Sequence, residues 1–341
     1  MARISIFGLV AFASWASALT YKGADISSVP EVEAAGITYT DSGSAKAFEK
    51  IIVDHGANTA RVRVWTSGTY DTDFAIAMGK RVKAAGMTLI VDLHYSDTWA
   101  DSGHQAIPSG WPTDLDGLNT EIYTYTQSIV SQFDSAGATI DILQVGNEIN
   151  DGLLWPVGRL STEGFSPASQ LINSAISGAK SVSSPKILIH LANGWDWSDL
   201  EWFFTGIFIS GAFEASSLDI AGVSFYPFYG TDATLAALKS SLTNLANLIG
   251  KEIIVAETDW PVTCSGVTLS ESVAVSAAGQ VTWIEDITSV LDSLPNERGQ
   301  GILYWEPGWI GNAALGSGCS DNLLVSGTGA TRSSIGMFVD M

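Results

Sequence analysis

The segments Leu143-Gln-Val-Gly-Asn-Glu148 and Ile254-Val-Ala-Glu257-Thr-Asp-Trp260 are the most informative parts of this chain for its fold. Each is a short apolar run of strand character that ends in a glutamate. Burying an ionised carboxylate is costly unless a neighbouring group compensates for it. In a barrel of alternating strands and helices, the carboxyl ends of the strands deliver side chains to the face where the loops gather. The two segments therefore predict that Glu148 and Glu257 meet at one face of such a barrel.

The alternation of strands and helices continues on both sides of these segments. Short β-rich runs predict strands at residues 21–26, 59–65, 88–94, 142–148, 186–191, 220–226, 252–258 and 301–305. Helix-compatible stretches lie between them, at residues 44–55, 74–85, 118–136, 167–182, 235–249 and 275–294. Eight such units in about 320 residues favour an α/β fold, a single-domain (β/α)8 TIM barrel. An open doubly wound sheet is disfavoured because the Gly-rich phosphate turn typical of that fold is missing.

Two carboxylates that face each other across a cleft are the working groups of a glycosidase. A separation of about 5–5.5 Å gives a retaining mechanism and one of about 6.5–9.5 Å an inverting mechanism, so the residues alone leave the stereochemistry open. The alternative is that one or both glutamates are structural and are held by salt bridges or backbone amides. Polar and aromatic residues cluster beside both of them, which favours the catalytic interpretation.

Two arginines, Arg61 and Arg63, alternate with valines, so the strand period places both on one face. An arginine inside a barrel needs an anionic partner, and a carboxylate nucleophile would be such a partner and would be kept ionised by it. We assign this role to Arg61 and expect the other arginine to form a structural ion pair near the barrel floor. The polar stretch that begins at Asp92 includes His94, for which we expect a substrate contact rather than a core position.

Nine of the 12 tryptophans fall at the ends of expected strands or in the loops that follow them. They are Trp65, Trp99, Trp111, Trp155, Trp195, Trp197, Trp260, Trp305 and Trp309. Flat apolar rings beside hydrogen-bonding groups are what the face of a sugar ring needs from a cleft. We expect about half of these rings only to pack the loops. Among them, Trp260, Trp305 and Trp309 are predicted to contact substrate.

The first 18 residues have the pattern of a secretory signal peptide, with Arg3 as the positive end and Ala16-Ser-Ala18 as the small residues before the cleavage site. No later stretch reaches the roughly 20 apolar residues of a membrane span. We therefore expect residues 19–341 to form one secreted, extracellular, soluble catalytic domain without a membrane partner. The formal net charge of −20 argues against nucleic acid as a partner. We also expect a monomer.

The two cysteines, Cys264 and Cys319, are expected to form a disulfide because secreted proteins fold in an oxidising compartment. The bridge would close a loop of about 55 residues, which is worth roughly 4 kcal/mol on the chain-entropy model. It would also connect two segments that lie near the predicted site.

With these residues in view, the chain resembles the endo-β-1,4-galactanases of glycoside hydrolase family 53, in the retaining clan A. The resemblance covers essentially the whole mature chain, and its ordered set of motifs is highly specific. The motifs are Tyr21-Lys-Gly-Ala-Asp-Ile-Ser27, Arg61-Val-Arg-Val-Trp65, Asp92-Leu-His-Tyr-Ser-Asp-Thr-Trp-Ala-Asp101, Gly146-Asn-Glu-Ile149, Gly152-Leu-Leu-Trp-Pro156, Val223-Ser-Phe-Tyr-Pro-Phe-Tyr229, Glu257-Thr-Asp-Trp-Pro261 and Tyr304-Trp-Glu-Pro-Gly-Trp-Ile-Gly-Asn312.

The resemblance implies that Glu148 is the general acid/base and Glu257 the nucleophile, with Arg61 and Tyr226 around the nucleophile. The substrate would be the β-1,4-galactan of type I arabinogalactan in pectin side chains. We expect the charge of Glu257 to raise the pKa of Glu148, and Arg61 to keep the pKa of Glu257 low. A bell-shaped pH profile with an acidic optimum follows.

The resemblance further implies that Asn147 hydrogen-bonds the 2-hydroxyl of the sugar and that Trp305 forms the platform beneath it. In this clan the peptide bond after that tryptophan is often cis, so we expect strain between Trp305 and Glu306. Some relatives bind calcium near the last loops, where the expected disulfide of this chain would give the same bracing. We therefore expect neither a required metal nor another cofactor.

Two places in the sequence depart from the usual pattern of the family. Two alternative functions also remain open. Ala192-Asn193 lies where relatives often carry an acidic residue, and Asp259 where asparagine is common, so we expect some substrate contacts to differ there. Another clan A β-glycanase, such as a mannanase or glucanase, would share the catalytic residues and differ in its subsites. A non-catalytic carbohydrate-binding barrel would have lost one carboxylate, and both are present.

Overall fold

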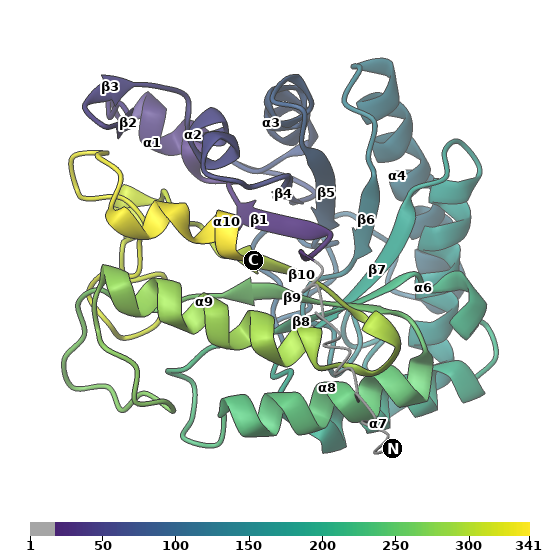
Figure 1. The fold of residues 1–341 in the computed structure, drawn as a ribbon. Helices are drawn as coiled ribbons and strands as arrows, with labels where there is room; N and C mark the ends of the chain where they lie inside the picture. The colour runs from purple at the N-terminus through teal and green to yellow at the C-terminus, as the bar shows by residue number, and fades with distance from the viewer. Residues whose placement is uncertain (1–17) are drawn as a thin grey trace, which may run out of the picture.

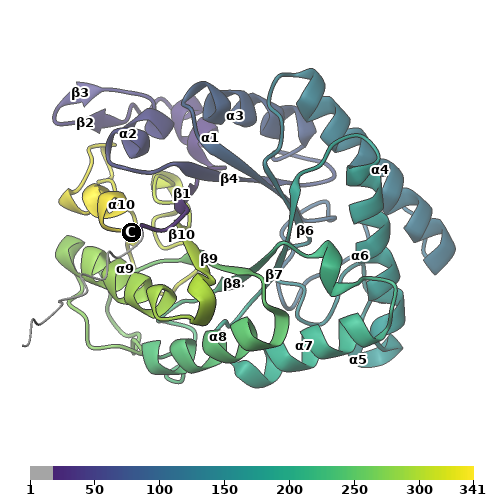
Figure 2. The same cartoon turned by 45° about the vertical axis from the view of Figure 1, so that its right-hand side comes forward.

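The computed structural model describes residues 18–341, so the expected signal peptide lies outside the described residues except for Ala18. Eight parallel strands close into a barrel in the order β1-β10-β9-β8-β7-β6-β5-β4, and helices surround it (Figures 1 and 2). The predicted (β/α)8 TIM barrel is therefore confirmed. The barrel strands are β1 (Tyr21–Asp25), β4 (Thr59–Val64), β5 (Thr88–Leu93), β6 (Ile142–Val145), β7 (Lys186–Leu191), β8 (Ile220–Ser224), β9 (Glu252–Thr258) and β10 (Gly299–Tyr304).

The helices that cover the barrel include all six predicted ones, and also the 13-residue helix α7 and several short elements that the sequence analysis did not indicate. The α-helices are α1 (Val29–Ala34), α2 (Phe48–Asp54), α3 (Thr72–Ala84), α4 (Leu115–Ser135), α5 (Leu160–Glu163), α6 (Phe165–Lys180), α7 (Trp197–Ile209), α8 (Leu235–Ile249), α9 (Ala277–Asp292) and α10 (Met337–Asp340). The 3₁₀ turns are η1 (Ala215–Ser217), η2 (Pro295–Glu297), η3 (Ile310–Asn312) and η4 (Ser333–Gly336). Several of the longer helices begin at a capping side chain, such as Asp71, which accepts from the backbone N–H of Phe74.

The helix expected from residue 44 begins only at Phe48, because a small hairpin precedes it. Strands β2 (Thr40–Asp41) and β3 (Ser44–Ala45) pair antiparallel. The two residues between them, Ser42 and Gly43, both have positive φ, at 49° and 78°. A two-residue turn with this backbone matches the twist of the strands it joins. The prediction of helix at residues 44–47 was therefore wrong.

The interior of the barrel changes from apolar to polar along the strands. Toward the amino ends of the strands, the interior is filled by a cluster of apolar side chains: Tyr21, Ile90, Ile142, Leu188, Ile220, Ile254, Ala256 and Leu303. Two residues further along three of these strands, the buried side chains are Asp92, Gln144 and His190. Because alternate residues of a strand face the same side, this polar layer lies directly above the apolar cluster. It forms the base on which a site at the carboxyl ends of the strands is built.

The pairing of β8 with β9 shifts in register just before Glu257. Val223 lies opposite Val255, whereas Ser224 lies opposite Glu257, so Ala256 is an extra residue in β9. Ala256 belongs to the interior cluster, and strict alternation would turn the next side chain outward. A bulge of this kind re-aims the side chain that follows it. The extra residue thus directs Glu257 into the barrel.

The disulfide between Cys264 and Cys319 is formed, as the sequence predicted. It joins the loop after β9 to the loop after β10, both of which lie at the carboxyl ends of the strands. In the part of the chain described here, no helix is long and apolar enough to cross a membrane.

Candidate active site

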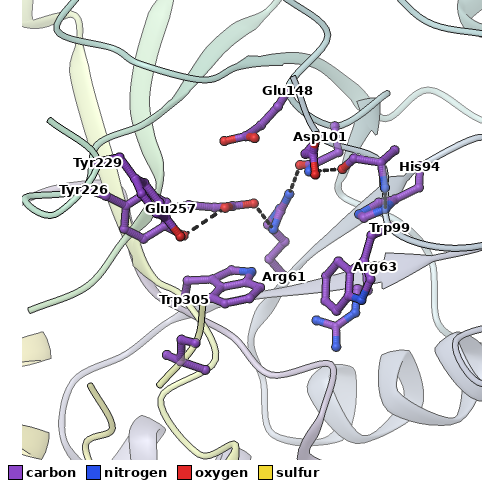
Figure 3. Close-up of a pocket in the computed structure, with 13 residues that line it drawn as sticks. Arg61, Arg63, His94, Trp99, Asp101, Glu148, Tyr226, Tyr229, Glu257 and Trp305 are labelled. Atoms are coloured by element: carbon purple, nitrogen blue, oxygen red, sulfur yellow. Dashed lines mark hydrogen bonds and ion pairs between the residues drawn. The ribbon is translucent and has the colours of Figure 1, made fainter. Parts of the chain in front are cut away.

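A cavity opens at the carboxyl ends of the barrel strands, and it brings together most of the residues that the sequence singled out (Figure 3). Seven of the nine residues predicted to be catalytic or to bind substrate line it: Arg61, His94, Asn147, Glu148, Tyr226, Glu257 and Trp305. The carboxyl groups of Glu148 and Glu257 face the same space (Figure 3). The predicted meeting of the two glutamates at one face of the barrel is therefore confirmed.

Arg61 lies at the centre of a buried ion-pair network below this cavity. Its Nη1 is 2.9 Å from Asp25 Oδ2 and 2.9 Å from Glu257 Oε1, and its Nη2 is 2.9 Å from Asp92 Oδ2. Nη2 also donates to Asn147 Oδ1 at 2.7 Å. One guanidinium therefore compensates three carboxylates that come from β1, β5 and β9. Its planar fork of donors suits such a task better than the point charge of a lysine.

Glu257 is buried, and hydrogen-bond donors face both of its oxygens. Arg61 contacts Oε1 at 2.9 Å, and the hydroxyl of Tyr226 donates to Oε2 at 3.0 Å. Burial nevertheless raises the pKa of Glu257 to about 8, because the effect of Arg61 is opposed by desolvation and by nearby carboxylates. The expectation that Arg61 keeps this pKa low was therefore wrong. Arg61 opposes the rise in the pKa of Glu257 but does not cancel it, because its charge is shared with two other carboxylates.

Glu148 is partly exposed and is held in the left-handed backbone region at φ 48°. Such strain in a residue other than glycine is typical of functional sites. Burial of the carboxyl group raises the pKa of Glu148, and the charge of Asp101 adds to the rise while Arg61 opposes it. The predicted direction was correct. Burial is the main cause, and repulsion between Glu148 and Glu257 also raises the pKa of Glu257.

Arg63 forms an ion pair, but not near the floor of the barrel as expected. It contacts Glu306, which is fully buried, and its Nη1 lies 3.7 Å from Asp25 Oδ1. Its guanidinium carbon also lies 3.9 Å from the ring centroid of Tyr70 and 4.5 Å from that of Trp99. Arg63 follows Arg61 by two residues toward the carboxyl end of β4, so it lines the cavity instead.

His94 and Asn147 line the cavity, and both also form hydrogen bonds with other residues of the protein. The backbone N–H of Ala100 donates to His94 Nδ1 at 3.1 Å, and His94 Nε2 lies 2.9 Å from Asp92 Oδ2. Because Nδ1 accepts, Nε2 carries the proton and donates to Asp92. Asn147 Nδ2 donates to the carbonyl of Ala100 at 2.9 Å. Their contacts with substrate stay predictions.

The three predicted tryptophans have different positions. Trp305 lines the cavity and lies edge-on to Trp99, with ring centroids 6.0 Å apart. Trp309 lies 6.3 Å from the ring of Trp305 but outside the cavity lining, so its role stays a prediction. Trp260 is fully buried, packs on Trp283 with centroids 4.9 Å apart, and donates through Nε1 to a backbone carbonyl. The predicted substrate contact of Trp260 was therefore wrong, because its ring points toward the helices.

The expected cis bond between Trp305 and Glu306 is absent. Among residues 18–341 the cis peptide bond lies between Trp155 and Pro156. Unusual backbone is still present at the predicted place, because Glu306 has φ 45°. Its carboxyl group is buried and accepts from the backbone N–H of Ser28 at 3.1 Å. The unusual geometry thus places a carboxylate against Arg63.

The two departures from the family pattern lie in different environments. Ala192 and Asn193 line a second cavity that adjoins the first and shares Glu148 with it. The expected difference in substrate contacts there remains a prediction. Asp259 is fully buried and its two carboxyl oxygens have no hydrogen-bond partner among the described residues. A direct substrate contact of Asp259 is therefore excluded by its burial.

Several polar residues of the site were missed because they lie inside apolar strands. They are Asp25, Gln144, His190 and Ser224, from β1, β6, β7 and β8. Gln144 accepts from Arg61 Nε at 2.9 Å and donates to Asp92 at 2.7 Å. A polar residue two positions after an inward apolar residue was the signal that could have identified Gln144 and His190. Within residues 18–341, no group of three His, Cys, Asp or Glu side chains is arranged to hold a metal ion.

Over most of its length, the chain is similar in sequence to one family of glycoside hydrolases. The sequence model of Glycosyl hydrolase family 53 matches residues 21–338. An arabinogalactan endo-β-1,4-galactanase of Thermothelomyces thermophilus is 46% identical over 333 residues, covering 94% of this chain and 99% of the relative. Arabinogalactan endo-β-1,4-galactanase A of Aspergillus niger is 43% identical over 339 residues, covering 95% of this chain and 96% of the relative.

Solved structures extend these similarities to the fold. A fungal β-1,4-galactanase structure superposes with a TM-score of 0.91 at 45% identity and covers 94% of this chain and 99% of that chain. The catalytic domain of an Ignisphaera aggregans member of the same family gives a TM-score of 0.84 at 27% identity, covering 94% and 95%. A family 10 structure from Paenibacillus barcinonensis, at 15% identity with a TM-score of 0.64, covers 94% and 95% and shares the fold alone.

Proposed function

Because the chain belongs to glycosyl hydrolase family 53, we propose that it is an endo-β-1,4-galactanase that hydrolyses internal bonds of galactan with retention of configuration. Its substrate would be the β-1,4-galactan of type I arabinogalactan, a pectin side chain. The observation that carries the proposal is the pair Glu148 and Glu257, which face one cavity at the carboxyl ends of β6 and β9. Curated relatives that are 43–46% identical bear the name of this activity.

In the first step, Glu257 attacks the anomeric carbon while Glu148 donates its proton to the glycosidic oxygen. The bond to the leaving sugar breaks as the bond to Glu257 forms, and the leaving chain departs as an alcohol. Arg61 and Tyr226 orient the two oxygens of Glu257, which lowers the entropy cost of reaching the reacting geometry. The partly exposed Glu148 can reach a leaving group that enters from solvent.

In the second step, the ionised Glu148 takes a proton from water, and the resulting hydroxide attacks the anomeric carbon. Glu257 leaves as a carboxylate, and Glu148 is protonated again. The sugar in this site would rest on the ring of Trp305, which lines the cavity. Asn147 has a second N–H besides the one donated to Ala100, and this N–H is available to the 2-hydroxyl.

The mature enzyme is proposed to be a secreted, extracellular monomer that spans residues 19–341 and needs no metal. The small residues Ala16-Ser-Ala18 and the positive end at Arg3 support cleavage before Leu19. Amino-terminal sequencing of the protein from culture medium tests the cleavage site, and size-exclusion chromatography tests the monomer. A mature chain that began elsewhere, or a stable dimer, would contradict these parts of the proposal.

The substrate is tested by measuring the reducing ends released from linear β-1,4-galactan, β-mannan, β-glucan and arabinan in parallel. Rapid release of short oligosaccharides from galactan alone is the expected result. A preference for mannan or glucan would keep Glu148 and Glu257 as the catalytic pair and replace the substrate. Binding to a polysaccharide without release from any of the four would instead indicate a carbohydrate-binding barrel.

A further inference from the structure

A chain of hydrogen-bond contacts leads from Glu148 into the interior of the barrel. Ser224 Oγ lies 2.5 Å from Glu148 Oε1, and His190 Nε2 lies 2.9 Å from the same Oγ. On the other side of the ring, His190 Nδ1 lies 2.8 Å from Asn147 Oδ1. His190 is fully buried, whereas Ser224 and Glu148 line the second cavity. The hydrogen bonds of the imidazole must therefore be made with the side chains that contact it.

The Asn147 end of the chain fixes the proton on the imidazole. Asn147 Nδ2 donates to the carbonyl of Ala100 at 2.9 Å, which turns Oδ1 toward His190 and Arg61. An amide oxygen only accepts, so the contact with His190 requires a proton on Nδ1. Gln144 Nε2 also lies 3.2 Å from Nδ1, but it has a shorter contact of 2.7 Å with Asp92 Oδ1. His190 is thus a donor toward Asn147.

The charge of the surroundings keeps His190 singly protonated. Burial lowers the pKa of His190 well below its usual value, and the charge of Arg61 lowers it further. With its one proton on Nδ1, the ring offers Ser224 only a lone pair on Nε2. The single proton of the Ser224 hydroxyl is then given to His190. The contact of 2.5 Å between Ser224 and Glu148 is compatible with a hydroxyl that donates to a carboxylate, but in this arrangement its proton is that of the Glu148 carboxylic acid.

We propose that Ser224 and His190 are positioning residues that hold the catalytic proton on Glu148. This inference rests on the proposed function, in which Glu148 is the general acid. With Glu148 protonated, each member of the chain has a partner: Glu148 donates to Ser224, Ser224 to His190, and His190 to Asn147. With Glu148 ionised, Ser224 can donate its single proton either to the carboxylate or to the imidazole. The other of these two acceptors then has no donor within the chain. An unsatisfied buried polar group is costly, so the chain favours the acid form.

The chain also explains how two glutamates that share one cavity receive different protonation states. Tyr226 and Arg61 present donors to Glu257. In the proposed chain, Ser224 instead accepts from Glu148 at their contact of 2.5 Å. These hydrogen-bond partners favour the proton on Glu148, whereas burial raises the pKa of both glutamates. After Glu148 has given this proton to the leaving group, the Ser224 hydroxyl turns toward the carboxylate. It turns back when Glu148 takes a proton from water in the second step.

The charged and titratable groups around the chain come from several elements. Those facing Glu148 are Asp101, Arg61, Glu257, Tyr226 and Tyr229. Those facing His190 are Arg61, His94 and Glu257, whose Oε1 lies 4.0 Å from Nδ1. Their charges act on wild type and on variants of Ser224 or His190 alike. A difference between these proteins therefore isolates the effect of the hydrogen-bond chain.

The test is the pH dependence of kcat/KM on galactan for wild type, Ser224→Ala and His190→Asn. The alkaline limb of this profile reports loss of the proton from the general acid in the free enzyme. We expect both variants to move this limb downward by about half to one pH unit, because one net hydrogen bond no longer favours the acid form. Ser169→Ala, a buried serine of α6 that donates to Ile207, is the matched control and leaves the limb unchanged.

The opposite result would overturn the proposal. A Ser224 hydroxyl that simply donated to the carboxylate would lower the pKa of Glu148, so Ser224→Ala would then move the limb upward. An unchanged limb in both variants would give Ser224 and His190 a role in packing only. Circular dichroism of each variant shows whether the barrel is intact.

A second measurement keeps the inference separate from the proposed function. Infrared titration of the carboxylic-acid band that disappears in Glu148→Gln follows this proton without turnover. The band titrates at lower pH in Ser224→Ala and His190→Asn if the chain holds the proton. Failure of wild type to cleave galactan would reject the proposed function, and this titration would still confirm or reject the inference.

Discussion

The surroundings of Glu257 and Glu148 differ although both residues stand at the carboxyl end of a barrel strand and face one cavity. Around Glu257, Arg61 and Tyr226 direct their donors at both carboxyl oxygens. Around Glu148, the charge of the Asp101 carboxylate raises the pKa, and the contact at Oε1 is a serine hydroxyl. Glu257 is buried, whereas Glu148 is partly open to solvent.

This comparison shows that neighbours, rather than the side chain itself, divide the chemical roles. Donors stabilise an ionised carboxylate that can attack, and an acceptor beside a partly exposed carboxyl group stabilises a proton that can be given away. Burial raises both pKa values and would on its own make the two glutamates alike. The strand bulge at Ala256 and the positive φ at Glu148 are the backbone features that place them in these different surroundings.

The largest expected effect is that of Glu257→Ala. Loss of the nucleophile should lower kcat on galactan by about 10⁴-fold or more. Glu252→Ala is the matched control, because it removes a carboxylate from the other end of β9 that pairs with Lys186 at 2.8 Å. That variant should keep near wild-type activity. Substantial galactan cleavage by Glu257→Ala, measured by released reducing ends, would remove the basis of the comparison.

A smaller and substrate-dependent effect is expected for Glu148→Gln. Loss of a general acid should lower kcat/KM on galactan by about 10²–10⁴-fold. An aryl β-galactoside with an acidic phenol as leaving group needs little protonation, so its first step should be affected much less. Burst kinetics of phenol release measure this step. Equal losses on both substrates would show that Glu148 does not protonate the leaving group.

Asp259→Asn is expected to change stability but not the reaction. Burial raises the pKa of Asp259 well above its usual value, and the charges of Glu257 and Glu306 add to the rise. The unfolded chain ionises this aspartate near pH 3.9 while the folded protein keeps the proton, so the folded state loses stability as the pH rises.

The neutral asparagine removes this loss. Above about pH 4, the stability of the Asp259→Asn variant relative to wild type should increase by about 1.4 kcal/mol per pH unit until the folded aspartic acid ionises. Urea unfolding at several pH values measures this difference. Parallel stability curves for the two proteins would mean that Asp259 is not protonated when folded, and that its surroundings resemble those of Glu257.

The sequence predicted those parts of the molecule that depend on local patterns. Short β-rich apolar runs located all barrel strands, and the glutamates at the ends of two runs located the site. Features that depend on packing between distant segments were not predictable in this way. Trp260 lies at a strand end but turns toward Trp283 of α9, and the direction of its ring is set by that contact.

The partners of the catalytic residues depended on register and were missed for the same reason. His190 and Ser224 belong to neighbouring strands, and their contact with each other requires the pairing of β7 with β8. The bulge in β9 was equally hidden, because Ile254-Val-Ala-Glu257 has no residue that marks an insertion. The inward direction of Glu257 was correctly predicted without the structural feature that produces it.

The most direct test of the assigned roles is the configuration of the product formed by Glu148→Ala with azide and an aryl β-galactoside. In this variant Glu257 can still form the glycosyl-enzyme, and azide can enter the space left by the Glu148 side chain. We predict a β-galactosyl azide, identified by the coupling constant of its anomeric proton in NMR. An α-galactosyl azide would mean that Glu148 is the attacking group, and the assignment of the two glutamates would be reversed.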